Sequence, residues 1–157
     1  MRLGALRAVA GALALVAAGI SAYLVTVHYA GGPIACFAGG GCETVQKSPY
    51  SLIGSVPLSV LGLAAYVALA LALLFRGELA AIASFALGLS VGILAVYLIV
   101  VQTIVLDAIC VWCMTTDAIA LALVVLTALR LRAEVRLADA RSLPPPPPAP
   151  DLAPPLG

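Results

Sequence analysis

Four long apolar stretches, separated by short polar segments, dominate the pattern of the chain. They cover residues 4–27, 56–75, 79–101 and 110–129. Each is close to the ~20 residues that a helix needs to cross the hydrocarbon core of a bilayer. Because backbone groups in lipid must find hydrogen bonds within their own segment, the pattern predicts four transmembrane helices. The expected fold is an all-α membrane protein, a four-transmembrane-helix bundle with up-and-down connections. The third stretch also carries small residues at four-residue spacing, which predict a close packing seam: Ser84, Gly88 and Gly92.

Composition and charge support a membrane protein. The 157 residues are 64% hydrophobic and only 10% charged, whereas about a quarter of a soluble domain is charged. The net charge of +1 provides no strong field for nucleic acid, so we expect no such partner. Arg2 and Arg7 precede the first stretch, as in a signal peptide. That stretch exceeds the ~7–15 apolar residues of such peptides and lacks a clear cleavage site, so a retained helix is expected.

The distribution of basic residues predicts the orientation in the membrane. Seven of the eight Lys and Arg residues fall before the first stretch, between the second and third, or after the fourth. Only Lys47 lies between the first and second stretches. Since basic residues gather on the cytoplasmic side, both termini of this multi-pass protein are expected in the cytoplasm, with the chain in the cell (plasma) membrane. The loop of residues 29–55, the connection of residues 102–109 and all four cysteines then face outward.

The long outer loop and the C-terminal tail have distinct compositions. The loop is rich in glycine around Cys36, which permits tight turns. Residues 42–47 are expected to form a short helix that stops at Ser48, because a residue before proline avoids the helical region. Residues 142–157 are dominated by proline and have little to bury, so they are interpreted as a disordered cytoplasmic tail. The four-helix transmembrane domain would then comprise residues 1–141.

The four cysteines form two closely spaced pairs. Cys110 and Cys113 make a C-x-x-C motif at a helix start, where unpaired N–H groups and the helix dipole stabilise a thiolate. Cys36 and Cys42 lie in the water-facing loop, where they can meet a soluble dithiol. Two pairs in series can relay electrons by thiol–disulfide exchange. A second pair at the bilayer edge requires a lipid-accessible acceptor, and a quinone meets that requirement.

Other interpretations of the cysteines stay open. Two purely stabilising disulfides with such short spacing would constrain little chain. A zinc site is disfavoured because the C-x5-C spacing lies outside the usual ligand spacing and the only histidine, His28, ends the first stretch; no metal is expected. Buried cysteines can also pack as small hydrophobes, which suits two spaced pairs poorly. A membrane scaffold or transporter subunit with structural disulfides is the non-enzymatic alternative.

Several runs of residues carry a family resemblance. They are the pair Cys36 and Cys42, the run CETVQKSPY from Cys42 to Tyr50, the run GSVP from Gly54 to Pro57 with Gly62 and Tyr66 after it, and the run CVWCMTT from Cys110. Over residues 5–130 the chain resembles the vitamin K epoxide reductase family in its bacterial or archaeal quinone-linked form. In the DsbB family, also four-helix quinone-linked oxidases, the C-x-x-C comes before the spaced pair. The reversed order here favours the vitamin K epoxide reductase type.

The resemblance implies a role for each cysteine. Cys36 and Cys42 would be a shuttle pair that meets a separate, exported thioredoxin-like (DsbA-like) protein, because the chain carries no fused thioredoxin-like domain. Cys110 and Cys113 would be the active-site pair beside a quinone of the ubiquinone, menaquinone or vitamin K type. Cys113 would lie closest to its ring, and a Cys42–Cys110 disulfide would be the bridging intermediate. The implied activity is quinone-dependent thiol–disulfide oxidation that supports disulfide-bond formation. Vitamin K epoxide or quinone reduction as the main role, and a DsbB-like oxidase, are the alternatives.

Three further residues are candidates for the quinone site. Ser48 matches a family serine or threonine that supports the site by hydrogen bonding. Asp117 stands where animal members have a tyrosine that contacts the quinone, one helical turn from Cys113 on the same face. Asp117 would bind a quinone oxygen or deliver a proton, unless it is only a carboxylate near water at the helix mouth. Trp112 would either stack near the quinone or anchor the helix at the membrane interface.

Overall fold

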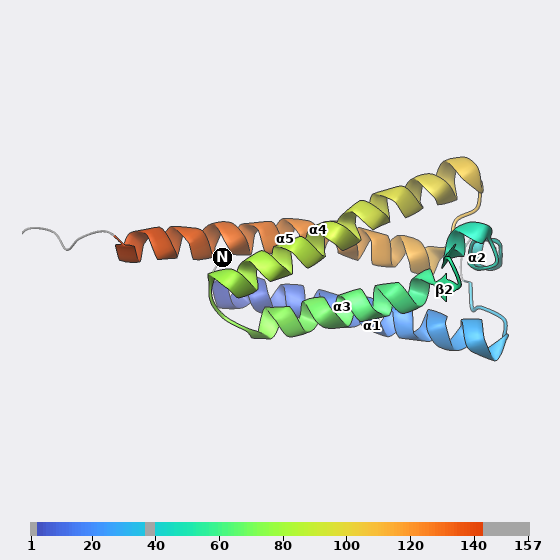
Figure 1. Ribbon diagram of the computed structural model, residues 1–157. Helices are drawn as coiled ribbons and strands as arrows, with labels where there is room; N and C mark the ends of the chain where they lie inside the picture. The colour runs from blue at the N-terminus through green and yellow to red at the C-terminus, as the bar shows by residue number, and fades with distance from the viewer. Residues whose placement is uncertain (1–2, 37–39, 143–157) are drawn as a thin grey trace, which may run out of the picture.

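Four long helices lie side by side in the computed structural model, which describes residues 3–36 and 40–142 (Figure 1). They are α1 (Leu3–Ala30), α3 (Leu58–Leu74), α4 (Glu78–Val100) and α5 (Val111–Ser142). The described chain is mostly helical, as the apolar stretches predict. The Pro-rich segment 143–157 lies outside the described residues.

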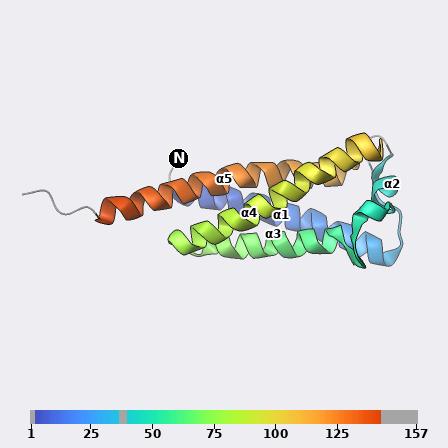
Figure 2. The same ribbon diagram turned by 45° about the horizontal axis from the view of Figure 1, so that its top comes forward.

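The core of the bundle combines small residues of one helix with larger residues of its neighbours. On α1 the buried positions recur every three or four residues and include Ala10, Ala14 and Ala17, which places them on one face. Leu69 of α3 and Leu123 of α5 are fully buried in the same cluster. The small alanine side chains of α1 let a neighbouring helix approach closely, and α1 packs mainly on α3. Helix α4 packs mainly on α5 (Figure 2).

Three of the helices are long and apolar enough to cross a membrane. These are Leu3–Ala30, Glu78–Val105 and Val111–Ser142 among the described residues. The fourth, α3, is apolar but has only 17 residues, less than the ~20 that span a bilayer without tilt or thinning. The composition and these helices characterise the chain as a membrane protein, while the count of four spans stays a prediction.

The start of the second apolar stretch is not helical, contrary to the prediction from residue 56. The strands β1 (Leu52–Ile53) and β2 (Val56–Pro57) form a short antiparallel hairpin instead. Helix α3 begins only at Leu58. Val56 precedes a proline, which disfavours the helical region for it. Gly54 makes the hairpin turn with a φ of 64°, a conformation that glycine adopts without steric cost.

The short helix expected after the first apolar stretch is present. It is α2 (Cys42–Gln46), followed by the 3-10 helix η1 (Pro49–Ser51). Ser48 between them is extended, with φ −70° and ψ 153°, as expected before Pro49. Together with the hairpin, α2 covers one end of the bundle, the end where α4 connects to α5 (Figure 1).

Helix α5 continues well beyond the apolar stretch that was expected to end at residue 129. It runs to Ser142 and projects past the other helices (Figures 1 and 2). Residues 130–142 are rich in Arg, Ala and Leu, which have high helix propensity. The helix therefore stays regular after the chain becomes polar, up to Ser142, the last described residue.

The small residues of the third stretch form the packing seam that the sequence predicts. Ser84, Gly88 and Gly92 are buried on α4 against α5. A Cβ atom on Gly88 would lie 2.7 Å from Thr127 Oγ1, and one on Gly92 would overlap the Val124 side chain. Glycine suits both positions because the Thr127 and Val124 side chains of α5 occupy the space that a Cβ on α4 would need.

Candidate functional site

The Cys36–Cys42 pair is joined by a disulfide at the end of the bundle that α2 covers. The two Cα atoms are 6.0 Å apart. Cys42 is the first residue of α2 and is only 1% exposed, while Cys36 lies in the segment that leaves α1. The pair thus has one cysteine held inside the protein and one on the connecting segment.

Cys110 and Cys113 lie at the start of α5. The backbone N–H of Met114 donates to the Cys110 carbonyl, which makes Cys110 the residue that opens the helix. The two sulfurs are 2.9 Å apart, and the Cys113 N–H donates to the Cys110 sulfur. Both are thiols in this structure. The C-x-x-C spacing therefore brings the sulfurs together at a helix N-terminus, where a thiolate is stabilised.

The two cysteine pairs meet in one apolar cluster. Cys42 and Cys110 are both buried in it, together with Val45, and Cys36 and Cys113 pack against it. Gly41 makes this contact possible because a Cβ there would lie 2.6 Å from the Ile109 nitrogen. The backbone just before Cys42 is thus held against the backbone just before Cys110, which brings the two pairs together.

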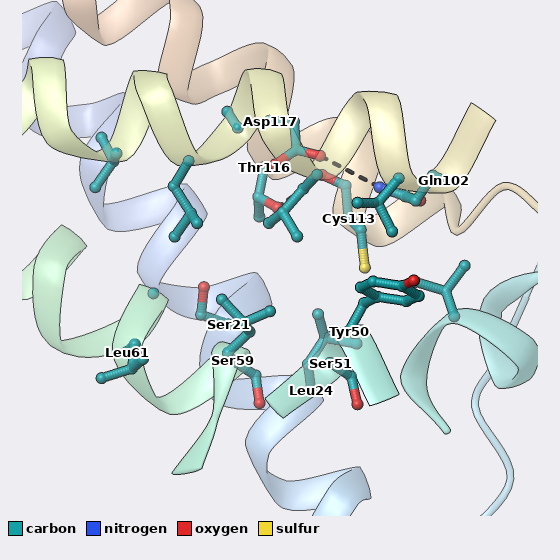
Figure 3. A pocket seen from close by; sticks show the side chains of 18 of the residues that line it. Ser21, Leu24, Tyr50, Ser51, Ser59, Leu61, Gln102, Cys113, Thr116 and Asp117 are labelled. Atoms are coloured by element: carbon teal, nitrogen blue, oxygen red, sulfur yellow. Dashed lines mark hydrogen bonds between the residues drawn. The ribbon is translucent and has the colours of Figure 1, made fainter. Parts of the chain in front are cut away.

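A cavity of about 240 Å³ lies beside Cys113, between α1, α3, α4 and α5 (Figure 3). Its walls are mostly apolar, with Leu24, Leu61 and Leu94 among the lining residues. Cys113 points its sulfur into this space above the Tyr50 ring (Figure 3). An apolar cavity with a few polar groups at one side is the usual form of a small-molecule site.

Asp117 lines the same cavity as Cys113, as the one-turn spacing predicts. The carboxyl is buried in the bundle, and its Oδ2 accepts a hydrogen bond of 3.3 Å from Gln102 Nε2 (Figure 3). The Gln102 Oε1 accepts a second bond, of 3.0 Å, from the backbone N–H of Cys110. Gln102 was not among the candidates from sequence, where it only marks the end of an apolar stretch; in the structure it connects Asp117 to the C-x-x-C motif.

Two more residues join the site, and the sequence marks them only as parts of the runs that carry the family resemblance. Gln46 donates from Nε2 to the Cys113 sulfur over 3.5 Å. It lies four residues after Cys42 on α2, a spacing that puts both on one helix face. Tyr66 is buried in α3, lines the cavity and donates its hydroxyl to the Thr116 carbonyl over 3.1 Å. Among the described residues, no three His, Cys, Asp or Glu side chains are grouped to hold a metal ion.

The remaining two candidates contact the loop rather than Asp117. Ser48 is buried, lines the cavity and donates its hydroxyl to the Val45 carbonyl over 2.7 Å, which closes the end of α2. Trp112 donates from Nε1 to the Ala35 carbonyl over 2.7 Å, and its ring lies 5.3 Å from that of Tyr23. The Tyr23 hydroxyl in turn accepts from the Ala35 N–H. These contacts hold the backbone next to Cys36 against α1 and α5.

These features define a helical membrane protein with two cysteine pairs in one cluster beside an apolar cavity. The model of the vitamin K epoxide reductase family matches residues 8–128. The chain therefore belongs to this family, which is a family of membrane oxidoreductases. No curated protein was found to match the chain. The family resemblance noted in the sequence is confirmed, and the bacterial or archaeal subtype stays a prediction.

Proposed function

We propose that the protein is a membrane thiol–disulfide oxidoreductase that takes electron pairs from an exported thioredoxin-like protein and delivers them to a quinone. The observation that carries this proposal is the position of the Cys110–Cys113 pair. Its first sulfur lies in one cluster with the Cys36–Cys42 disulfide, and its second lines an apolar cavity. The pair thus lies between a donor route and an acceptor site.

The proposed electron path is a series of balanced exchanges. A reduced partner dithiol attacks the Cys36–Cys42 disulfide, so the partner becomes a disulfide and the loop pair becomes two thiols. The Cys42 thiolate then attacks Cys110 of an oxidised Cys110–Cys113 pair, forming the Cys42–Cys110 disulfide. Cys36 resolves that bond, which restores the Cys36–Cys42 disulfide and leaves Cys110 and Cys113 as thiols. Oxidation of this dithiol releases two electrons and two protons, the amount that one quinone takes up to become a quinol.

The cavity residues fit a quinone ring. The walls are apolar, as the ring requires, and Cys113 and Asp117 supply a sulfur and a carboxyl to the same space. A bound quinone would supply the two-electron acceptor that thiol chemistry lacks. Asp117 would hold a proton at its carboxyl or donate a hydrogen bond to a quinone oxygen. Ser48 would support the cavity by fixing the end of α2, and Trp112 would act by holding the Cys36 segment.

The proposed topology has four spans, both termini in the cytoplasm and the cysteines outside. The positive-inside bias supports it, because seven of eight basic residues lie in three segments of one expected side. Arg7 donates to the carbonyls at the C-terminal end of α3, while the cysteines lie at the N-terminal end of that helix. The short α3 would span with local thinning of the bilayer.

The deciding experiment is quinone reduction by the purified protein in lipid nanodiscs, with a reduced thioredoxin-like donor in excess. We expect ubiquinone or menaquinone to be reduced at a rate proportional to protein concentration. Cys113→Ser and Cys110→Ser should reduce the rate to that without protein. Thr115→Ala is the matched control, because this exposed hydroxyl lies two residues from Cys113 and donates only to its own helix, at Val111.

Two outcomes would contradict the proposal. One is a wild-type protein that leaves both quinones oxidised while the donor stays reduced. The other is full activity in Cys113→Ser, which would favour a scaffold with structural disulfides. Vitamin K epoxide offered as the oxidant in the same assay tests whether epoxide reduction is the main role.

A further inference from the structure

Gln102 is a buried amide with both of its polar ends bonded. It is 2% exposed, in a region of the bundle that is otherwise apolar. Its Nε2 donates to Asp117, one turn after Cys113, and its Oε1 accepts from the N–H of Cys110, at the mouth of α5. A buried amide is costly unless its hydrogen bonds are satisfied. Here one side chain just after α4 satisfies two groups of the candidate site, one in α5 and one on the residue before it.

The backbone around Gln102 is irregular in a way that serves this contact. Residues Val101–Val105 form the π-helix η2 at the end of α4. Within it Val101 and Gln102 are buried, whereas Ile104 is 76% exposed. The Gln102 carbonyl accepts from the Ala108 N–H, so the turn that leads back to Cys110 starts at the same residue. Single π-helical turns of this kind occur frequently at functional sites.

We propose that Gln102 is a positioning residue that fixes the position of the Asp117 carboxyl relative to the Cys110 backbone. Asp117 is then in place to transfer protons while the Cys110 and Cys113 thiols are oxidised. This inference rests on the proposed quinone reduction. Gln102 is neither oxidised nor consumed. The two electrons pass from the Cys110–Cys113 dithiol to the quinone, and the two protons pass from the thiols to the quinone oxygens through or beside Asp117.

Each of the two hydrogen bonds has a separate consequence. The bond to Oδ2 commits one carboxyl oxygen to Gln102 and leaves the other for the cavity. The bond from the Cys110 N–H commits a donor on the residue that carries the first sulfur of the C-x-x-C motif. Freeing that N–H would allow it to stabilise a thiolate, which favours the dithiol over the disulfide.

The test compares Gln102→Met, Asp117→Asn and the double variant in nanodiscs. Gln102→Met keeps the length of the side chain and removes both polar ends. Asp117→Asn keeps an oxygen that can accept from Gln102 Nε2 but cannot exchange a proton. Thr103→Val is the matched control, because it lies next to Gln102 in the same π-helix, is exposed and bonds only to Ile99 and Val100.

The first readout is kcat for quinone reduction. A misplaced catalytic group costs on the order of 10²-fold in rate, so we expect Gln102→Met to lose about 10²-fold in kcat with the KM for the thiol donor unchanged. In the Asp117→Asn background the same substitution should have less than about a twofold effect, because the two residues act as one unit. Equal losses in both backgrounds, or wild-type kcat in Gln102→Met, would overturn the proposal.

The second readout needs no quinone and therefore separates this inference from the proposed function. The dithiol-to-disulfide ratio of Cys110 and Cys113 is measured in glutathione buffers by thiol alkylation. We expect Gln102→Met to shift the ratio toward the dithiol by about fivefold, the factor that one hydrogen bond contributes, while Thr103→Val leaves it unchanged. If wild type fails to reduce quinone but this shift occurs, only the proposed function fails. If wild type reduces quinone and the shift is absent, the positioning role fails.

Discussion

The two ends of the bundle both bury polar side chains, but they use them in different ways. At the end opposite the cysteines, Arg7 donates to the Leu73 and Leu74 carbonyls, and Arg130 donates to the Phe75 carbonyl. At the cysteine end, Asp117 and Gln102 bond each other and lie at a cavity. We refer to the two regions as the arginine end and the cysteine end.

The difference lies in what the hydrogen bonds satisfy. The last carbonyls of a helix have no partner within it, and α3 ends at Leu74. Arg7 and Arg130 supply donors for its last carbonyls, so the arginine end is a structural cap on a short helix. The cysteine end instead keeps a thiol and a carboxyl oriented toward open space. A buried charged residue therefore indicates function only where its partners leave room for a ligand.

The largest effect on stability is expected from Arg130→Met. This side chain is 1% exposed and also donates to Ser84 Oγ over 2.8 Å. Its loss removes the donor to the Phe75 carbonyl and leaves the Ser84 hydroxyl with only its bond to the Ala80 carbonyl. Removing a charged hydrogen-bond donor should lower the free energy of unfolding by roughly 2 kcal/mol or more. Thermal unfolding in nanodiscs measures the change, and quinone reduction per folded molecule should stay at the wild-type value.

The control for this prediction is Arg132→Met. Arg132 lies two residues away on the same helix and is exposed, so its loss should leave the midpoint nearly unchanged. If Arg130→Met instead kept its thermal midpoint and lost activity, the arginine end would belong to the chemistry and the comparison would be wrong.

A smaller effect is expected at the seam that joins the two ends. Gly92→Ala places a methyl group against Val124, and such overpacking typically costs about 1–3 kcal/mol. The strain should push α4 away from α5 and lengthen the contact between Gln102 and Asp117. Adding Val124→Ala makes room for the methyl group, so the double variant should regain most of the thermal midpoint and activity.

Gly19→Ala is the control for the seam. No atom lies within 4 Å of a Cβ at this exposed position of α1, and replacing a helical glycine there should be neutral or stabilising by about 0.5–1 kcal/mol. A Gly92→Ala variant as stable as Gly19→Ala would show that the seam tolerates separation.

The apolar helices and the C-x-x-C geometry follow from local patterns, which explains why they could be predicted. Runs of about 20 apolar residues have few alternatives to a helix in lipid. The spacing of Cys110 and Cys113 brings their sulfurs together in any helix. The short helix at Cys42 was equally predictable, because Pro49 determines where it stops.

The features that the sequence did not reveal depend on contacts between distant segments. The burial of Gln102 results from a π-helical turn, which no apolar pattern encodes. Val56 was predicted to begin a helix because it is apolar, but the proline after it favours an extended strand. Trp112 was predicted to be a quinone contact or an interfacial anchor. In the structure it contacts Tyr23 of α1 and Ala35 in the segment that follows α1. Such pairings emerge only when the helices pack.

The smallest effect is expected from an ion pair on the outer face of the cysteine end. Lys47 Nζ lies 2.6 Å from Glu43 Oε1, and both side chains are mostly exposed. The hydrogen bond and the charge of Lys47 lower the pKa of Glu43 below its usual value of 4.5.

A carboxyl whose pKa is lower in the folded state stabilises the fold above its unfolded pKa, and this contribution disappears as the pH falls through the folded value. Lys47→Ala should therefore lower the thermal midpoint only slightly at pH 7. The difference from wild type should shrink below pH 4.5 and vanish once the pH lies below the lowered pKa of Glu43. High salt should remove it as well, because exposed pairs are screened. A difference that persists at pH 3, or a loss of quinone reduction in Lys47→Ala, would mean that this surface belongs to the redox site after all.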